Sequence, residues 1–176
     1  MRTRFAAAVV LLAAALAPAQ DKDKDKDPPL TPKQRSSARF TSQAAQLMQK
    51  GEWDRGIRLC DSALRLDPDN VDARWMRGLA YLKTNEPELA VADFTGALKR
   101  DAKFAPAYRD RGLAHMAKKD YARALADFTE YVKLRPTDPD GYRERGLAYQ
   151  AKGEKAKAEA DFRKAKELKA GAAKKD

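Results

Sequence analysis

The chain has 176 residues, 35% of which are charged, and its formal net charge is +10 at pH 7. This length fits one domain with two ends, and nine glycines and nine prolines are too few for a chain that is disordered throughout. Cys60 is the only cysteine and His115 the only histidine, which excludes an internal disulfide and a typical zinc site. The folded part must therefore be stable through packing alone.

Residues 1–19 have the features of an export signal. Two arginines precede an uncharged apolar run over 5–16, and Ala17-Pro18-Ala19 provides the small residues that a cleavage site requires. The run is shorter than the roughly 20 apolar residues that span a bilayer. We expect cleavage before Gln20 and a periplasmic or secreted protein; the alternative is membrane anchoring by an uncleaved N-terminal segment.

The next segment, 20–36, is predicted to be a disordered or extended linker. It contains an alternating Asp-Lys run over 21–27, followed by Pro28, Pro29 and Pro32. A segment with so few apolar residues has no face to bury, and its prolines stiffen it.

Two short sequence motifs then recur at a fixed step of 34 residues. Arg-Gly-Leu-Ala begins at 77, 111 and 145, and Ala-Asp-Phe begins at 92, 126 and 160. A fixed period of this length is the signature of a stacked-repeat protein. Within each unit, apolar residues recur at helical spacing in two bursts, which predicts two helices joined by a turn. The four units are 37–70, 71–104, 105–138 and 139–172, and a basic tail, 173–176, follows.

Turns and caps are predicted between the apolar bursts, for example at Thr84-Asn85 and Lys119-Asp120. We expect Asn85, Asp120 and Asp138 to cap the helices that follow them, the last of these ahead of Pro139 in a first helical turn. Helices of about a dozen residues are marginal alone in water, so stacking of the units must stabilise them.

Small and aromatic residues at set places make the units resemble the tetratricopeptide repeat family. In the third unit these residues are Gly112, Ala124, Phe128 and Pro136; the second and fourth units match similarly, and the first is the weakest. The resemblance covers about 37–172. It implies an all-α fold, a right-handed superhelical solenoid of four helix-turn-helix hairpins. The first helices would line its concave side and the second helices its convex side.

Charged residues at two places of the unit vary together. An arginine of the first helix accompanies an aspartate of the second helix in three units, as Arg77 with Asp93, Arg111 with Asp127, and Arg145 with Asp161. The first unit has Gln43 and Leu59 there and so loses both charges. We predict structural ion pairs, either between the two helices of a hairpin or with the next hairpin.

Glycine and alanine also exchange places. Units two to four have a glycine such as Gly78 in the first helix and an alanine such as Ala90 in the second, whereas the first unit has Ala44 and Gly56. We interpret this exchange as one close contact point between the two helices of a hairpin. The space there holds one glycine and one alanine, and either helix can supply the larger residue.

The last unit differs on one face. Apolar residues that the earlier units carry at two places become Glu159 and Lys166. These places should face the following repeat, so the final helix is predicted to be a polar cap of the stack.

No residue set predicts an enzyme, a cofactor or a metal site. We call positions that are 34 residues apart a column. His115 is in one column with Tyr81 and Tyr149 and is expected inside its hairpin, and Cys60 takes the place of a core phenylalanine. The two stand two units apart, which excludes a cysteine–histidine nucleophile. For Cys60 an intermolecular disulfide is the alternative to simple burial.

The resemblance implies a peptide-binding groove lined by one stripe of the first helices. The stripe falls at i, i+4 and i+7 in three units: Trp75, Leu79 and Leu82; Arg109, Leu113 and Met116; Arg143, Leu147 and Gln150. Leucine and methionine with two arginines suit a segment that is apolar and partly acidic. The asparagines and lysines with which family members clamp acidic chaperone C-termini are absent from this stripe. Two alternatives stay open: the leucines pack between neighbouring first helices, and Trp75 fills the core.

These features favour an exported, non-enzymatic scaffold that binds a peptide segment of a protein partner. The alternative function is electrostatic binding of an anionic envelope polymer or a membrane surface through the basic C-terminal end. It is suggested by the net charge of the units, which rises from 0 in 37–70 to +3 in 139–172. Self-association is a third hypothesis. We do not expect nucleic-acid binding, because the basic residues are diffuse and paired with acids.

Overall fold

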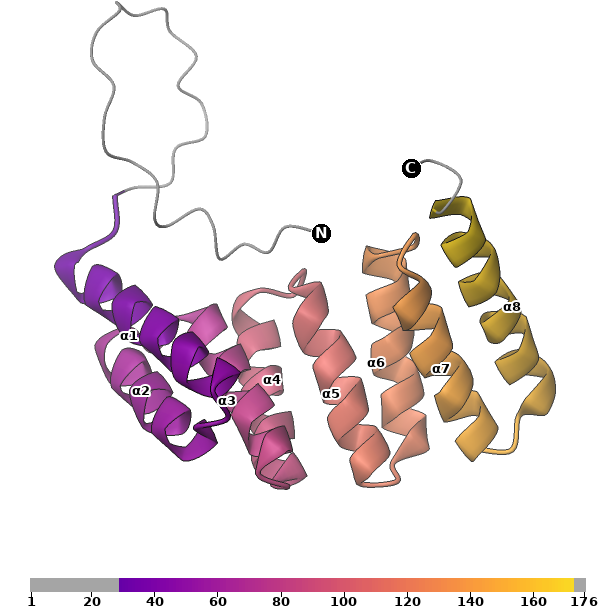
Figure 1. Cartoon of the computed structure of the whole chain (residues 1–176), viewed down its shortest axis with the longest axis horizontal. Coiled ribbons are helices and arrows are strands. Elements are labelled where there is room, and N and C mark those ends of the chain that lie inside the picture. The colour runs from indigo at the N-terminus through magenta and orange to yellow at the C-terminus, as the bar shows by residue number, and fades with distance from the viewer. Residues whose placement is uncertain (1–28, 173–176) are drawn as a thin grey trace, which may run out of the picture.

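The structure, a computed structural model, describes residues 29–172 (Figure 1). Within these residues the chain forms helices and no strand. None of the described helices is long and apolar enough to cross a membrane. The helices are α1 (Pro32–Gln49), α2 (Trp53–Leu66), α3 (Val71–Lys83), α4 (Pro87–Arg100), α5 (Ala105–Ala117), α6 (Tyr121–Leu134), α7 (Pro139–Ala151) and α8 (Lys155–Ala172).

The helices pair into four hairpins that stack side by side along one direction (Figure 1). Each first helix packs against its own second helix, and each second helix packs against the first helix of the next hairpin. In addition α1 packs against α3, and α3 against α5, so the first helices lie on the inner side of the curve. The predicted all-α solenoid of helix-turn-helix units is therefore confirmed.

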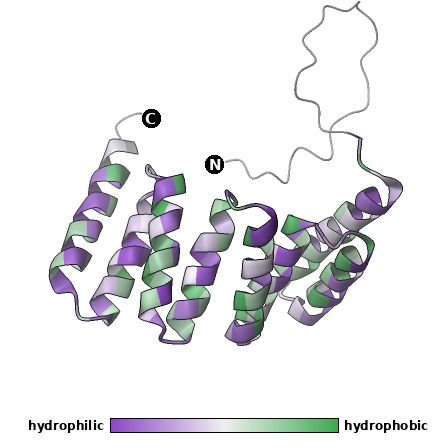
Figure 2. Ribbon diagram, turned by 180° about the vertical axis from the view of Figure 1, so that it is seen from behind, coloured by the Kyte–Doolittle hydropathy of each residue, from purple (hydrophilic) through white to green (hydrophobic). Residues whose placement is uncertain are grey.

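The helices are amphipathic, as a stack of this kind requires. Figure 2 shows hydrophobic and hydrophilic positions alternating along each helix. One stripe of each helix is buried against its neighbours, while the opposite stripe faces water. The apolar residues of neighbouring hairpins merge into shared clusters, one of which runs from Ala90 and Phe94 on α4 to Phe104 and Ala107 at α5.

The first helix begins earlier than the sequence analysis predicted. The linker was expected to extend to residue 36, but α1 begins at Pro32. Thr31 accepts a hydrogen bond from the backbone N–H of Gln34, whose side chain bonds back to the Thr31 N–H. This capping box, with a proline in the first turn, starts the helix within the segment assigned to the linker. The expected export signal, residues 20–28 and the tail 173–176 lie outside the described residues.

The end of each first helix is built from one recurring left-handed residue. Gly51, Asn85, Lys119 and Gly153 have φ values of 79°, 63°, 59° and 87° and stand 34 residues apart. Around Lys119, its own N–H donates to the carbonyl of Met116, and the N–H of Asp120 donates to that of His115. The other three turns repeat this pattern, which is a Schellman motif.

This geometry corrects one predicted cap. Asn85 was expected to be an N-cap, but it is the left-handed residue that follows α3, and Glu86 stands at the N-cap of α4. Asp120 and Asp138 do cap α6 and α7 with their side chains. Asparagine tolerates both roles because its short polar side chain favours N-caps and also left-handed backbone.

The close contact inside each hairpin joins a glycine to a large side chain. A Cβ added to Gly78 or Gly112 would lie 2.7 Å or 2.6 Å from the ring of Phe94 or Phe128. In the first hairpin Cys60 replaces the ring and Ala44 fits in place of glycine, while Gly56 faces Met48 instead. The glycines therefore mark a close contact between the two helices of a hairpin, as interpreted, but the side chain that fills the space is not the alanine. Gly78, Gly112 and Gly146 each make room for a phenylalanine ring, and Gly56 makes room for Met48.

The left-handed turns yield a stability prediction. Left-handed backbone costs a residue with a Cβ about 1–2 kcal/mol, which glycine avoids at some cost in chain entropy. Lys119→Gly should therefore raise the free energy of unfolding by about 0.5–1 kcal/mol, measured by urea unfolding at unchanged m-value.

The control is Lys118→Gly, which removes the neighbouring lysine from the same turn together with its ion pair to Glu88. Lys118 has φ −81° and ψ 0°, so a glycine there relieves no strain and should lower stability. Equal effects of the two substitutions would show that loss of a lysine charge, and not backbone strain, determines the change.

Candidate functional site

The predicted groove residues lie on α3, α5 and α7, the first helices of the second, third and fourth hairpins. Their exposure changes along the stack: the three on α3 and the three on α5 are half-buried, whereas the three on α7 are exposed. Leu147 is 42% exposed and belongs to none of the described core clusters, while Leu79 and Leu113 pack against such clusters. The apolar stripe is thus shared between packing and exposed surface.

Trp75 joins the second hairpin to the third. Its Nε1–H donates to a carboxylate oxygen of Asp110 at 2.6 Å, and its ring meets Phe104 edge-on with centroids 5.6 Å apart. The tryptophan therefore fills space between hairpins, as the alternative in the sequence analysis allowed.

Arg109 has a corresponding contact one hairpin further on. Its Nε and Nη2 donate to both carboxylate oxygens of Glu144, with the shortest distance at 2.5 Å. Glu144 is only 4% exposed, and the hydrogen bonds raise the pKa of Arg109 above its ordinary value. Arg109 had been expected to offer its charge to a partner. In the structure the fourth hairpin already neutralises that charge.

Sequence reasoning missed the two acids in these contacts. Asp110 and Glu144 stand 34 residues apart, in the column that holds Ser42 and Met76 in the earlier units. Their partners, Trp75 and Arg109, precede them by 35 residues. The sequence did contain a signal for these contacts. In two successive units, a carboxylate follows a hydrogen-bond donor of the previous unit by 35 residues: Asp110 follows Trp75, and Glu144 follows Arg109.

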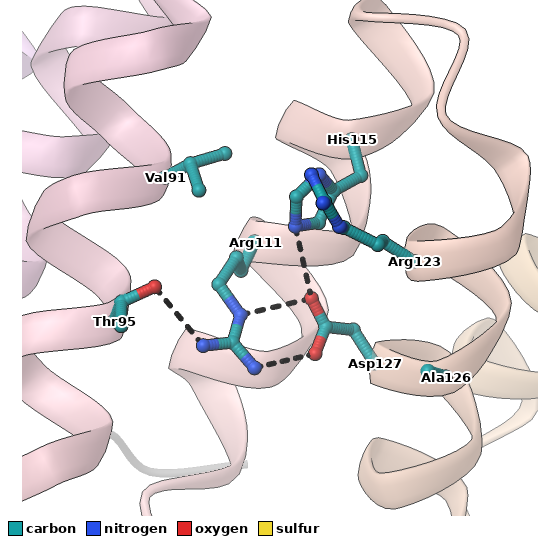
Figure 3. A pocket seen from close by; sticks show the side chains of 7 residues that line it. All are labelled: Val91, Thr95, Arg111, His115, Arg123, Ala126 and Asp127. Atoms are coloured by element: carbon teal, nitrogen blue, oxygen red, sulfur yellow. Dashed lines mark hydrogen bonds and ion pairs between the residues drawn. The ribbon is translucent and has the colours of Figure 1, made fainter.

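The arginine–aspartate pairs lie on the other side of the first helices (Figure 3). Arg111 donates from Nε and Nη2 to Asp127 of its own hairpin, at 2.9 Å and 2.7 Å, and from Nη1 to Thr95 of the preceding hairpin at 3.0 Å. Arg77 bonds Asp93 and, in the preceding hairpin, Asp61 in the same way. Arg145 bonds Asp161. Each pair lies within a hairpin, and two of them also reach backwards.

An open pocket of about 360 Å³ lies beside the central pair and is lined by residues of α4, α5 and α6. Figure 3 shows the side chains that line it: Val91, Thr95, Arg111, His115, Arg123, Ala126 and Asp127. The Nε2 of His115 is 3.9 Å from Asp127, and its Nδ1 is buried without a hydrogen-bond partner. Burial lowers the pKa of His115 despite the nearby aspartate, so the imidazole is neutral at pH 7.

The Cys60 thiol is not prepared for nucleophilic chemistry. Burial raises the pKa of the Cys60 thiol to about 12, which leaves it protonated and unreactive at neutral pH. Among the residues that the structure describes, no three histidine, cysteine, aspartate or glutamate side chains are grouped to hold a metal ion.

Stacked hairpins of two helices with glycine–aromatic contacts define an α-solenoid repeat protein. The family model "Tetratricopeptide repeat" matches residues 42–106, 80–139 and 109–173. The chain belongs to the tetratricopeptide repeat family.

Solved structures share the fold at low sequence identity. A crystal structure of MamA matches with a TM-score of 0.75 and 23% identity, covering 78% of this chain and 81% of that one. MamA from Desulfovibrio magneticus RS-1 matches with a TM-score of 0.73 and 21% identity, covering 77% and 76%. The first TPR domain of Spaghetti (RPAP3), bound to an HSP90 peptide, has a TM-score of 0.67 and 21% identity and covers 68% and 95%.

One curated relative is a peptidyl-prolyl cis-trans isomerase, PASTICCINO1 of Arabidopsis thaliana. It is 36% identical over 58 residues, which are 33% of this chain. The match spans only 9% of that protein's length.

The central ion pair generates a stability prediction. Arg111 and Asp127 have side chains 20% and 7% exposed, so removal of one leaves the other charge buried and uncompensated. Arg111→Leu should cost about 3–5 kcal/mol of unfolding free energy. The double variant Arg111→Leu, Asp127→Leu should cost far less, measured by thermal melting in a double-mutant cycle. Simple addition of the two single losses would show that the pair does not act as a unit.

Asp110 makes stability depend on pH. Burial raises the pKa of its carboxyl to about 6, although the Trp75 N–H and the Arg109 charge act in the opposite direction. The folded state therefore binds a proton more tightly than the unfolded state, whose pKa is about 3.9. The stability that this proton contributes is complete below about pH 4 and is lost as the pH rises to about 6.

Asp110→Asn removes the carboxyl whose ionisation lowers stability, and the amide still offers an oxygen to the Trp75 N–H. Relative to the wild type, the variant should gain on the order of 2 kcal/mol in unfolding free energy between pH 4 and pH 7. Urea unfolding at a series of pH values measures the difference. Glu159→Gln, an exposed carboxyl-to-amide change on α8, is the control. A difference between Asp110→Asn and the wild type that does not change with pH would contradict the assignment.

Proposed function

We propose that this chain is a non-enzymatic scaffold that binds a peptide segment of a protein partner along its concave side. The observation that carries the proposal is that α3, α5 and α7 each place apolar side chains at matching positions of the stripe, half-buried on α3 and α5 and exposed at Leu147 on α7. Leu82, Met116 and Leu147 all keep part of their surface exposed in this stripe. Soluble domains seldom expose a contiguous apolar surface that has no binding role.

The chemistry of the bound peptide segment is inferred from the stripe residues that make no polar contact with the following hairpin. Trp75 and Arg109 are engaged between hairpins, so contact with a peptide depends chiefly on the leucines, Met116 and the α7 residues. Arg143 has a side chain 44% exposed and is the arginine that best suits an acidic residue of the partner. The segment is therefore mainly apolar, with an acid toward the α7 end.

The solved TPR domain of Spaghetti (RPAP3) supports the general mode, because its title describes a bound HSP90 peptide. This chain lacks the asparagine and lysine clamp expected for acidic chaperone C-termini. We infer the same kind of surface with a different, more apolar specificity.

A second candidate is electrostatic binding of an anionic polymer or membrane. It is favoured by the basic fourth unit, where α8 carries exposed Lys155, Lys157, Lys164 and Lys166. Such binding weakens steeply with salt, whereas apolar groove binding does so much less.

We also propose that the protein is exported, on the evidence of the charged start, the apolar run and the small residues of 1–19. A mature chain from its native host should begin at Gln20, as measured by intact mass. A full-length species in the membrane fraction would replace export with anchoring.

The groove is tested with a random peptide library selected on the full chain. We expect the selected peptides to be apolar with acidic residues, and Met116→Glu to weaken their binding by about tenfold or more. The matched control is Leu89→Glu, the same kind of change at a residue that is 45% exposed on α4, outside the concave stripe. Equal losses in the two variants, or selection of no peptide, would contradict the proposal.

A further inference from the structure

The last hairpin presents a different end from the three before it. In the first two hairpins, a second-helix residue accepts a hydrogen bond from an arginine of the next hairpin: Asp61 from Arg77, and Thr95 from Arg111. The residue in this column of the fourth hairpin is Arg163, which is exposed. The stack therefore ends with a cation where earlier hairpins offer an acceptor.

A second column changes in the same direction. Val132 of α6 lies against Gly141 of α7, where an added Cβ would be 3.2 Å from its methyl group. Its counterpart in the last hairpin, 34 residues on, is Lys166, which is exposed. A fifth hairpin of the same kind would bring an arginine onto Arg163 and lose apolar contact at Lys166, so the end rejects another copy of the repeat.

The concave side ends with a related feature. A first-helix residue donates to a carboxylate 35 residues later in two successive steps, Trp75 to Asp110 and Arg109 to Glu144. Arg143 is the third member of this column, and the next carboxylate would belong to a fifth hairpin. Arg143 lies 3.6 Å from Glu144, which already accepts from Arg109, and 3.5 Å from the exposed Asp140 on its own helix. Its side chain is 44% exposed, so it has a surface ion pair but no carboxylate from a following hairpin. Leu147, one turn along α7, is also exposed.

We propose that this end of the stack docks an acidic amphipathic helix of a protein partner in the place of a fifth hairpin. A carboxylate of that helix pairs with Arg143, further acids face Arg163 and Lys166, and an apolar side chain covers Leu147. The occupant is a helix because a helix occupies the corresponding place on every earlier hairpin, as α3, α5 and α7 do. The inference rests on the proposed function only in that the partner is a protein.

A second copy of this chain does not fit the same end. Its first helix, α1, would offer Ser42 in the column of Asp110 and Glu144, and Gln43 in the column of the paired arginines. Neither residue supplies a carboxylate to Arg143 or Arg163. The charge of the end therefore selects an acidic partner over a head-to-tail assembly.

The test uses helix-stabilised peptides with the sequence of Pro139–Ala151, the first helix of the last hairpin. In the unmodified peptide, Glu144 faces Arg143 of the protein, but Arg145 of the peptide faces Arg163 of the protein. The peptide with Arg145→Glu presents a carboxylate to each of these two arginines. We expect the Arg145→Glu peptide to bind the full chain about tenfold more tightly than the unmodified one. Arg163→Glu in the protein should reverse this order, and Arg143→Gln should weaken binding of both peptides.

Controls separate this proposal from the groove. Met116→Glu should leave peptide binding at the end unchanged, so failure of the groove and failure of the end are distinguishable. Arg143 and Arg163 are exposed, and unchanged melting temperatures will show that their variants fold. The proposal is overturned if Arg163→Glu does not reverse the peptide order. It is also overturned if phosphatidylglycerol vesicles bind through Arg163 while neither peptide does, which would assign the end to a membrane surface.

Discussion

The arginine–aspartate contact on the outer side of the first helices is the interaction on which the regularity of this stack depends. A guanidinium group has five N–H donors in a fixed plane, so a single side chain can hold two neighbours in one geometry. Arg111 uses this plane to bind Asp127 of its own hairpin and Thr95 of the preceding one. One side chain therefore links the two helices of a hairpin to each other and to the hairpin before them.

The glycine–aromatic contacts complement these polar links from inside. Gly112 admits the ring of Phe128 so closely that an added Cβ would overlap it. The apolar contact gives most of the burial, while the planar ion pair fixes direction, since dispersion and hydrophobic burial are not directional. The first hairpin, with Cys60 and Leu59 in place of the ring and the acid, keeps the packing by local exchange of volumes.

Stacking and binding compete for the same concave residues. Trp75 and Arg109 have the chemistry of interface anchors, yet both make their strongest contacts with the following hairpin. Only the last hairpin has no successor among the described residues, so its corresponding residues Arg143 and Leu147 stay exposed. The exposed part of this stripe therefore lies toward the C-terminal end of the stack.

The sequence by itself determined the repeat length, the helix-turn-helix unit, most of the turns and the polar end of the stack. These are local properties, since a period of 34 residues and an apolar stripe are visible in one unit or its copies. Local signals were still misjudged where one residue type serves two roles, as at Asn85, and where Thr31-Pro32 started a helix inside a charged linker. Only the tertiary structure decided which columns meet. Arg109 contacts Glu144, which is 35 residues later in the chain, one more than the repeat of 34. The way neighbouring first helices pack determines this spacing, and no pattern within a single unit specifies it.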